Sequence, residues 1–337
     1  MTMSPGGEAL TAMLLLSAAE VASLLDLDAL ADALQAAMTD LSAGRVSVPP
    51  RVAALVPERD AMLAAMPAYL PAAGALAAKL VSVFPRNRDE PSHHALICCF
   101  DPATGAAVAV LDGTYLTAAR TAAGSAVATR LLARPGASRV AVIGTGVQAR
   151  AHARALARLP GVRTVLITGR DPSKASALAG ELVTAGVPAQ AVASAEDAVR
   201  SADVVCAATH AASPVLRREW LRPGTHVNSV GYNTSGDGEI DPAIIRDALV
   251  VVESRAAALA PFPAGAVELL RAVERAAIDE GRIAEVGEIA AGSAPGRASD
   301  TQLTLYKSVG VAAQDAAAAA LVLAAARERG AGTHFTM

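Results

Sequence analysis

The sequence has few cysteines, few aromatic residues and few charges. It contains three cysteines among 337 residues, Cys98, Cys99 and Cys206. They lack a paired spacing, so neither a disulfide framework nor a zinc site is predicted, and we expect no bound metal. Charged residues make up 18% of the chain and the formal net charge is -3. This balance gives no electrostatic reason to bind nucleic acid or an anionic membrane, and we expect neither partner.

Targeting and membrane-spanning segments are also missing from the pattern. The apolar run Leu10 to Ala19 has no basic residue before it, so it predicts an N-terminal strand and helix rather than a signal peptide. It leads into one amphipathic segment over Ala18 to Met38. The apolar stretch Val309 to Ala326 is interrupted by Gln314 and Asp315, and it predicts a packing helix rather than a membrane span. A cytoplasmic protein is expected.

Small apolar residues are what the sequence has in abundance. Hydrophobic residues make up 53% of the chain, and many of them are alanines, which favour helices and let them pack closely. A chain of this length exceeds the usual size of one hydrophobic core, so two domains are predicted.

Two patterns divide the chain. Between Val48 and Gly113, short apolar runs alternate with turn residues, which predicts an antiparallel sheet, and a helix is predicted from Thr117 to Leu132. After Pro135, strands alternate with helices, which is typical of a parallel, doubly wound sheet. The predicted fold class is therefore α/β, with a Rossmann-type doubly wound sheet over residues 121–311. A second, α+β domain is formed by both chain termini, residues 10–120 with 312–332.

The strongest motif runs from Val140 to Ala149 (VAVIGTGVQA). Gly144 permits a tight strand-to-helix turn, and Gly146 lets the backbone approach a pyrophosphate. The N-terminus of the following helix offers free N–H groups to the phosphates. The motif predicts a dinucleotide site made by Gly144, Thr145, Gly146, Val147 and Gln148. A plain tight turn is the alternative.

The end of the second strand indicates which dinucleotide binds. An NAD site usually has Asp or Glu there, to accept hydrogen bonds from the ribose, but this sequence has Gly169. Arg170 comes next, followed by Ser173 and Lys174, and a guanidinium suits a 2′-phosphate. NADP(H) is favoured and NAD(H) remains possible. The alternative is that Arg170 is an ordinary solvated loop residue.

Seven segments in order resemble the ornithine cyclodeaminase/mu-crystallin family over nearly the whole chain. The resemblance implies a homodimer in which the terminal segments form a substrate-binding and dimerisation domain. It also implies small α-amino or α-imino acid substrates. The segments are Lys79 to Asn87, Ser92 to Gly105, Asp112 to Ala123, Ile143 to Ala149, Trp220 to Gly231, Glu239 to Asp241 and Thr304 to Gly310.

The resemblance implies that Arg51, Lys79 and Arg120 hold the substrate carboxylate beside the nicotinamide. A carboxylate in a partly desolvated cleft favours charge-assisted donors of this kind. A buried lysine near two guanidiniums has a lowered pKa, which makes Lys79 a candidate proton donor to an imine. The alternative is a lysine whose ammonium reaches solvent at a strand edge.

The resemblance also implies a set of cofactor contacts. The two threonines in it also suit helix caps or strand ends. Neither His152 nor His210 has metal-ligand spacing, and Lys307 has no evident role. The implied contacts are His93, Arg120, Thr121, Thr209, Val230 and Ser308.

One position departs from the family. Ornithine cyclodeaminases and alanine dehydrogenase-like members resemble one another in an aspartate two residues after the glycine matched by Gly231, and here Asn233 stands there. An amide cannot accept a proton as a carboxylate does. Cyclodeamination is therefore disfavoured, although Asp237 is close in sequence, and Asn233 is predicted to orient the substrate amine.

The predicted function is an NAD(P)H-dependent reductase of α-imino acids, an oxidoreductase acting on CH–NH or CH–NH₂ groups. Three alternatives stay open from the residues and the resemblance. They are a cyclodeaminase-type lyase with bound NAD, an alanine dehydrogenase-like enzyme, and a non-catalytic NADPH-dependent ligand-binding protein.

Overall fold

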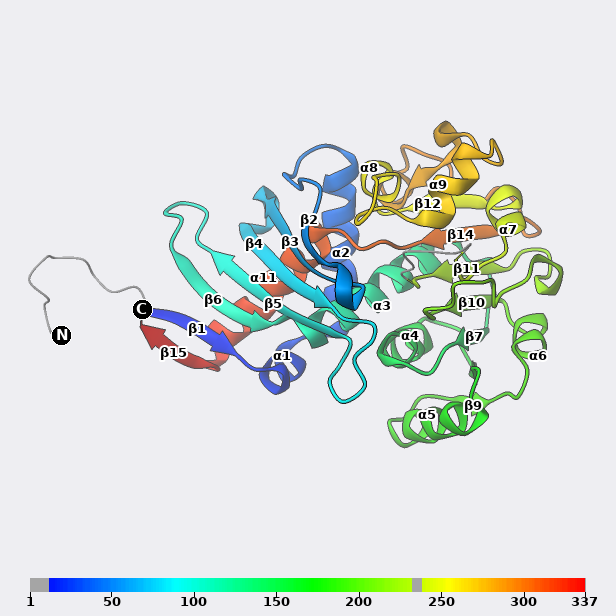
Figure 1. Cartoon of the computed structure of the whole chain (residues 1–337), viewed down its shortest axis with the longest axis horizontal. Coiled ribbons are helices and arrows are strands. Elements are labelled where there is room, and N and C mark those ends of the chain that lie inside the picture. The colour runs from blue at the N-terminus through cyan, green and yellow to red at the C-terminus, as the bar shows by residue number, and fades with distance from the viewer. Residues whose placement is uncertain (1–11, 232–237, 337) are drawn as a thin grey trace, which may run out of the picture.

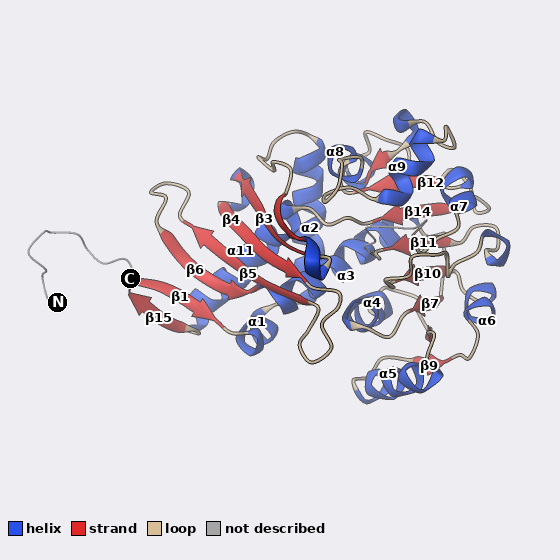
Figure 2. Ribbon diagram, in the orientation of Figure 1, coloured by secondary structure: helices blue, strands red, loops and turns tan. Residues whose placement is uncertain are grey.

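The computed structural model describes residues 12–231 and 238–336, which form two sheets with helices packed against them (Figures 1 and 2). The first sheet has the strand order β15-β1-β6-β5-β4-β3-β2. Its strands are β1 (Ala12–Leu16), β2 (Val52–Val56), β3 (Ala61–Leu70), β4 (Ala75–Val83), β5 (His93–Phe100), β6 (Ala107–Asp112) and β15 (Thr333–Thr336).

The second sheet has the order β13-β12-β14-β11-β10-β7-β8-β9, and each neighbouring pair in it is parallel. The chain runs outward from β7 in both directions, which confirms the predicted doubly wound, Rossmann-type sheet. Its strands are β7 (Arg139–Ile143), β8 (Thr164–Thr168), β9 (Ala189–Ala191), β10 (Val204–Ala207), β11 (His226–Ser229), β12 (Leu249–Val252), β13 (Ala284–Glu285) and β14 (Thr304–Lys307).

Helices cover both sheets and join them (Figure 2). None of the helices in residues 12–231 and 238–336 is long and apolar enough to cross a membrane. They are α1 (Ala18–Leu24), α2 (Leu27–Ser42), α3 (Gly113–Leu132), α4 (Val147–Ala157), α5 (Pro172–Thr184), α6 (Ala195–Arg200), α7 (Pro242–Asp247), α8 (Arg255–Ala258), α9 (Val267–Glu274), α10 (Val286–Ala290) and α11 (Ala312–Arg329).

One local prediction needs correction. The amphipathic segment expected over residues 18–38 is two helices, because Asp26 caps the start of α2 by accepting the N–H groups of Asp28 (2.8 Å) and Ala29 (3.0 Å). Such a cap begins a new helix. The strands between Val48 and Gly113 pair antiparallel as predicted, and β1, outside that range, joins the sheet parallel to β6.

Helix α3 begins earlier than predicted and links the two sheets. Asp112 caps it by accepting the N–H of Tyr115 at 2.8 Å, so the helix starts at Gly113. It runs without interruption through residues 120 and 121, where the sequence places the domain boundary. The division into residues 10–120 with 312–332 and 121–311 stays a prediction.

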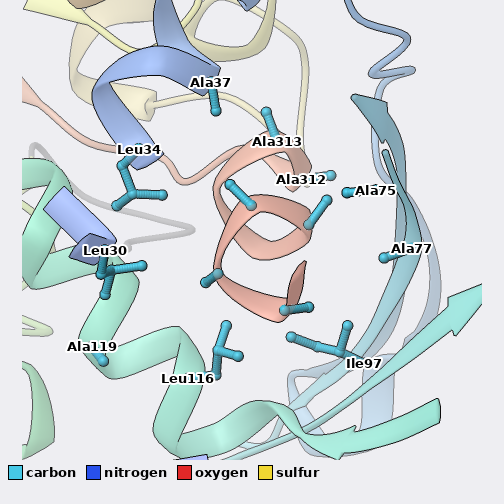
Figure 3. Close-up of a cluster of buried hydrophobic side chains, with 14 of the residues drawn as sticks. Leu30, Leu34, Ala37, Ala75, Ala77, Ile97, Leu116, Ala119, Ala312 and Ala313 are labelled. Atoms are coloured by element: carbon cyan, nitrogen blue, oxygen red, sulfur yellow. The ribbon is translucent and has the colours of Figure 1, made fainter. Parts of the chain in front are cut away.

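Helix α11 returns the chain from the second sheet to the first, as expected for the closing alanine-rich segment. Figure 3 shows it between helices α2 and α3 on one side and the strands of the first sheet on the other. Alanines face each other across this contact, Ala312 and Ala313 on α11 and Ala75 and Ala77 on β4, and all four are buried. Small side chains on both surfaces let the backbones approach closely. This packing brings the N-terminal turn of α11 against β4.

Candidate active site

A buried carboxylate on α11 joins two of the three predicted substrate-binding cations. The Nζ atom of Lys79 lies 2.8 Å from Oδ2 of Asp315. The Nε atom of Arg120 donates to Oδ1 of Asp315 at 2.9 Å, and its Nη1 donates to Gln314 at 2.9 Å. Lys79 and Arg120 come from β4 and α3, so the fold brings them together on one acid.

The strand register explains the environment of Lys79. Met66 and Ile97 lie directly opposite it on the two neighbouring strands, and all three side chains are buried. Burial, followed by the charge of Arg120, lowers the pKa of Lys79 to about 7, although Asp315 partly opposes the shift. Lys79 therefore gains and loses a proton near neutral pH, as a proton donor to an imine requires.

Arg51 completes the cation cluster from the segment before β2. Its Nη2 donates to the carbonyl oxygens of Val309 and Gly310, both at 2.8 Å. Its charge also contributes to the lowered pKa of Lys79. The three cations are therefore close together, as the resemblance implies.

Asp315 is a residue that the sequence reasoning missed. The sequence does contain a signal for Asp315, because this residue is an acid in an otherwise apolar helix. That acid was used only as evidence against a membrane span. Burial alone would raise the pKa of Asp315, but the charges of Arg120 and Lys79 outweigh burial and the pKa is lowered.

His93 and Thr121 lie beside the cations. His93 shares the inner face of the sheet with Lys79, since the β4–β5 register pairs Val83 with His93. Burial first, and then the charges of Lys79 and Arg120, lowers the pKa of His93 to about 4, so the imidazole is neutral near pH 7. The hydroxyl of Thr121 donates to the carbonyl of Thr117 at 2.7 Å, which leaves only its lone pairs for a ligand.

The glycine motif forms the predicted turn between β7 and α4. Gly144 has φ +131°, and a Cβ there would lie 2.5 Å from the carbonyl oxygen of Ala208, so this position requires glycine. Gly146 precedes α4 and provides no side-chain cap, and the space around its α-carbon is open. The first N–H groups of α4 therefore have no side-chain cap, and uncapped groups of this kind are the ones that bind phosphates at helix N-termini. Thr145, Val147 and Gln148 complete this turn.

The residues that follow β8 lie next to the glycine turn, and the sequence predicts that they contact a 2′-phosphate. A Cβ at Gly169 would lie 3.0 Å from the Thr145 side chain, so the two turns touch. Arg170, Ser173 and Lys174 are exposed. The hydroxyl of Ser173 donates to Asp171 at 2.6 Å, so its proton is already used.

A second buried carboxylate, Glu239, organises the carboxyl ends of β10 and β11. It accepts hydrogen bonds from the backbone N–H and hydroxyl of Thr209, both at 2.8 Å, from the Ser229 hydroxyl at 2.9 Å, and from the Gly231 N–H at 2.7 Å. Because strands of a parallel sheet end at one edge, Thr209 lies on the same edge as Gly144. Glu239 fixes that edge, and the sequence reasoning did not assign it this role.

Lys307 now has a structural role. Its Nζ donates to Ser229 (3.2 Å), to the Gly231 carbonyl (2.9 Å) and to Glu268 (3.2 Å), all inside the protein. A buried ammonium is tolerated only with partners of this kind. Lys307 therefore supports the end of β11 from β14.

The last two predicted cofactor contacts also lie at this edge. The N–H of Val230 donates to the Ala207 carbonyl at 3.0 Å, which extends β11 by one residue. The hydroxyl of Ser308, at the end of β14, donates to Glu253 at 2.6 Å. Asn233 lies outside the described residues. Residues 12–231 and 238–336 contain no group of three His, Cys, Asp or Glu side chains that could hold a metal ion.

These features define a class of protein. A doubly wound sheet with an open glycine turn at its switch point is a dinucleotide-binding fold. At the turn after β14 lies a cluster of three cations, of which Lys79 and Arg120 are buried. A model of the ornithine cyclodeaminase/mu-crystallin family matches residues 11–330. The chain belongs to this family.

Known proteins of this family are similar to the chain over nearly its whole length. The mouse ketimine reductase mu-crystallin is 36% identical over 294 residues, 86% of this chain and 89% of the mouse protein. The structure of Thermococcus litoralis Δ1-pyrroline-2-carboxylate reductase in complex with NADH and L-proline has a TM-score of 0.90 and 36% identity, and covers 95% of this chain and 99% of its own. An archaeal alanine dehydrogenase dimer with bound NAD has a TM-score of 0.88 and 32% identity, covering 97% and 100%.

Proposed function

We propose that the chain is an NADPH-dependent reductase that converts a small α-imino acid to the amino acid. The observation that carries the proposal is the pair of buried cations Lys79 and Arg120 on Asp315, with the half-buried Arg51 nearby, in which Lys79 has a pKa of about 7. Similarity to a ketimine reductase and a pyrroline-2-carboxylate reductase supports it.

The residues divide the chemistry between them. Arg51 and Arg120 hold the substrate carboxylate through charge-assisted hydrogen bonds. Bound reduced nicotinamide would supply the hydride for the C=N carbon. Lys79 donates the proton to nitrogen and Asp315 keeps its ammonium in place, so the mechanism needs only orientation and charge complementarity. Asn233 orients the substrate amine in this proposal.

The turn from Gly144 to Gln148 holds the pyrophosphate of the cofactor, and Thr209, Val230 and Ser308 line the same edge. The nicotinamide is approached from the side of the first sheet by His93 on β5 and by Arg120 and Thr121 on α3. The preference for NADPH over NADH rests on Arg170 and Lys174, with Ser173 beside them, and on the lack of an acid at Gly169.

A related reaction is favoured by one comparison. The similarity to an alanine dehydrogenase suits the same pocket, because oxidation of an amino acid is imine reduction in reverse. A cyclodeaminase-type lyase is disfavoured by Asn233, and a purely ligand-binding role by the presence of Lys79 and both arginines. A cytoplasmic location stays a prediction.

The proposal includes a homodimer. One face of the first sheet is turned away from α11 and exposes five apolar side chains. We call this surface the outer apolar face; its residues are Val52, Leu63, Tyr69, Leu80 and Leu96. In the strand register, Val52 and Leu80 both pair with Ala65, and Leu80 pairs with Leu96, so they form one row across four strands. An apolar surface of this kind favours burial against a second copy.

The test is turnover by the purified protein with NADPH and a panel of cyclic ketimine carboxylates. We expect oxidation of NADPH with formation of one equivalent of the cyclic amino acid. No turnover across the panel, including 2-oxo acids with ammonia or methylamine, would remove the proposal.

A further inference from the structure

A third buried carboxylate, Glu253, lies directly after β12 and binds the turn of residues 308–310. Its Oε1 accepts the Ser308 hydroxyl at 2.6 Å and the Gly310 N–H at 3.1 Å, and its Oε2 accepts the Val309 N–H at 3.2 Å. Successive backbone N–H groups that converge in this way form a nest for an anion. Gly310 has φ +71°, a conformation that favours glycine. The turn is therefore shaped around a negative charge from another element.

The opposite side of the same turn faces the substrate cations. The carbonyl oxygens of Val309 and Gly310 accept Nη2 of Arg51. A Cβ at Gly310 would lie 2.6 Å from Nη1 of Arg120, so this guanidinium packs on the glycine. The turn thus holds Glu253 on its N–H side and the two arginines on its other side.

We propose that Glu253 is a positioning residue for the substrate carboxylate, an inference that rests on the proposed function. Glu253 holds the turn of residues 308–310 in the conformation that aims Arg51 and Arg120. It does not touch the substrate itself. Without it, both guanidiniums lose the surface that fixes their direction, and the charge-assisted hydrogen bonds that hold the substrate carboxylate weaken.

The variant Glu253→Gln tests the role, because glutamine keeps the size, removes the charge and turns an amide N–H₂ toward backbone N–H groups. We expect KM for the imino acid to rise about 10- to 100-fold, with a much smaller change in kcat. Binding of L-proline to the enzyme loaded with cofactor should weaken in the same ratio. Glu253→Asp, which keeps the charge, should recover part of the loss.

The matched control is Glu288→Gln. Glu288 is a partly buried carboxylate whose hydrogen bonds go to the Glu285 N–H (2.9 Å) and to Arg255 (2.6 Å) rather than to the turn of residues 308–310. The variant Glu288→Gln should lower the melting temperature of the protein without changing KM for the imino acid. A merely structural role for Glu253 predicts the same result for Glu253→Gln.

An active Glu253→Gln enzyme with unchanged KM would overturn the inference. If this variant does not fold, Glu253→Asp is measured in the same way, and an unchanged KM has the same meaning. If the unmodified protein reduces no imine, the proposed function fails instead. In that case a crystal structure of Glu253→Gln tests the inference separately. The inference is contradicted if Arg51 keeps both hydrogen bonds to the carbonyls of Val309 and Gly310, and it is supported if Arg51 loses them.

Discussion

At the scale of single residues, the account depends on the protonation of Lys79. Its pKa of about 7, lowered first by burial and then by Arg120, means that the ammonium form is lost as the pH rises through that value. We expect kcat/KM to fall above about pH 7, because this parameter reports the free enzyme. Lys79→Met should lower kcat by about 100- to 10,000-fold and remove this part of the profile. Both proteins are assayed with the same substrate, so any titration of the substrate itself appears in both pH profiles. If the fall in kcat/KM above about pH 7 persists in Lys79→Met, Lys79 is not the group that titrates.

Asp315 should tune that proton. Its charge raises the pKa of Lys79 against the effect of burial, so Asp315→Asn should move the fall in kcat/KM to lower pH. The variant should also lose about 3–5 kcal/mol of stability, as expected when one member of a buried pair is removed. Denaturant unfolding measures the loss. A profile shifted to higher pH would contradict the assigned electrostatics.

Arg170 carries the predicted cofactor preference. Arg170→Ala should raise KM for NADPH about 10- to 100-fold, the loss expected for a hydrogen bond to a charged group, and leave KM for NADH nearly unchanged. Steady-state kinetics with each cofactor measure the ratio. An equal effect on both cofactors would mean that Arg170 does not contact the 2′-phosphate.

At the scale of elements, the β7–α4 turn allows a substitution that separates folding from binding. A Cβ at Gly146 meets no atom within 4 Å, so Gly146→Ala should fold normally. The methyl group would nevertheless occupy the approach of the pyrophosphate, and the dissociation constant for NADPH should rise about tenfold or more. Fluorescence titration measures it.

Gly180→Ala is the control for that variant. Gly180 lies in α5 and also has open space around it, but it is away from the turn. Its alanine variant should bind NADPH normally and gain about 0.5–1 kcal/mol from helix propensity. If both variants bind NADPH with the same dissociation constant, the pyrophosphate does not lie at the β7–α4 turn.

The elements were predictable from the sequence where the pattern is local. The strands β7 and β8 and the glycine turn follow from short apolar runs and from Gly144 and Gly146. Asp315 was not assigned a role, because its partner Arg120 lies 195 positions away in the sequence and no local pattern relates them. Glu239 was not assigned a role for the same reason, since its hydrogen-bond donors come from two separate segments, Thr209 after β10 and the end of β11. Periodicity also cannot detect a helix start set by one cap, which is why α2 was joined to α1.

At the scale of the whole molecule, the outer apolar face should join two copies. Leu80→Asp places a charge in the middle of that face and should convert the dimer to a monomer, because a stable interface buries about 800 Å² per partner and tolerates unpaired charge poorly. Light scattering after size-exclusion chromatography measures the mass. Val183→Asp, at an exposed apolar residue of α5, is the control and should leave the mass unchanged. A Leu80→Asp protein that stays dimeric would move the interface elsewhere.

The central claim is that the cation cluster presents an imine to a hydride. The most direct measurement uses NADPH carrying deuterium at both C4 positions of the reduced ring and a cyclic ketimine carboxylate. The account predicts one deuterium at the α-carbon of the amino acid product, seen by mass spectrometry. Product without the label, or ammonia released from ornithine with no net change in the cofactor, would contradict it.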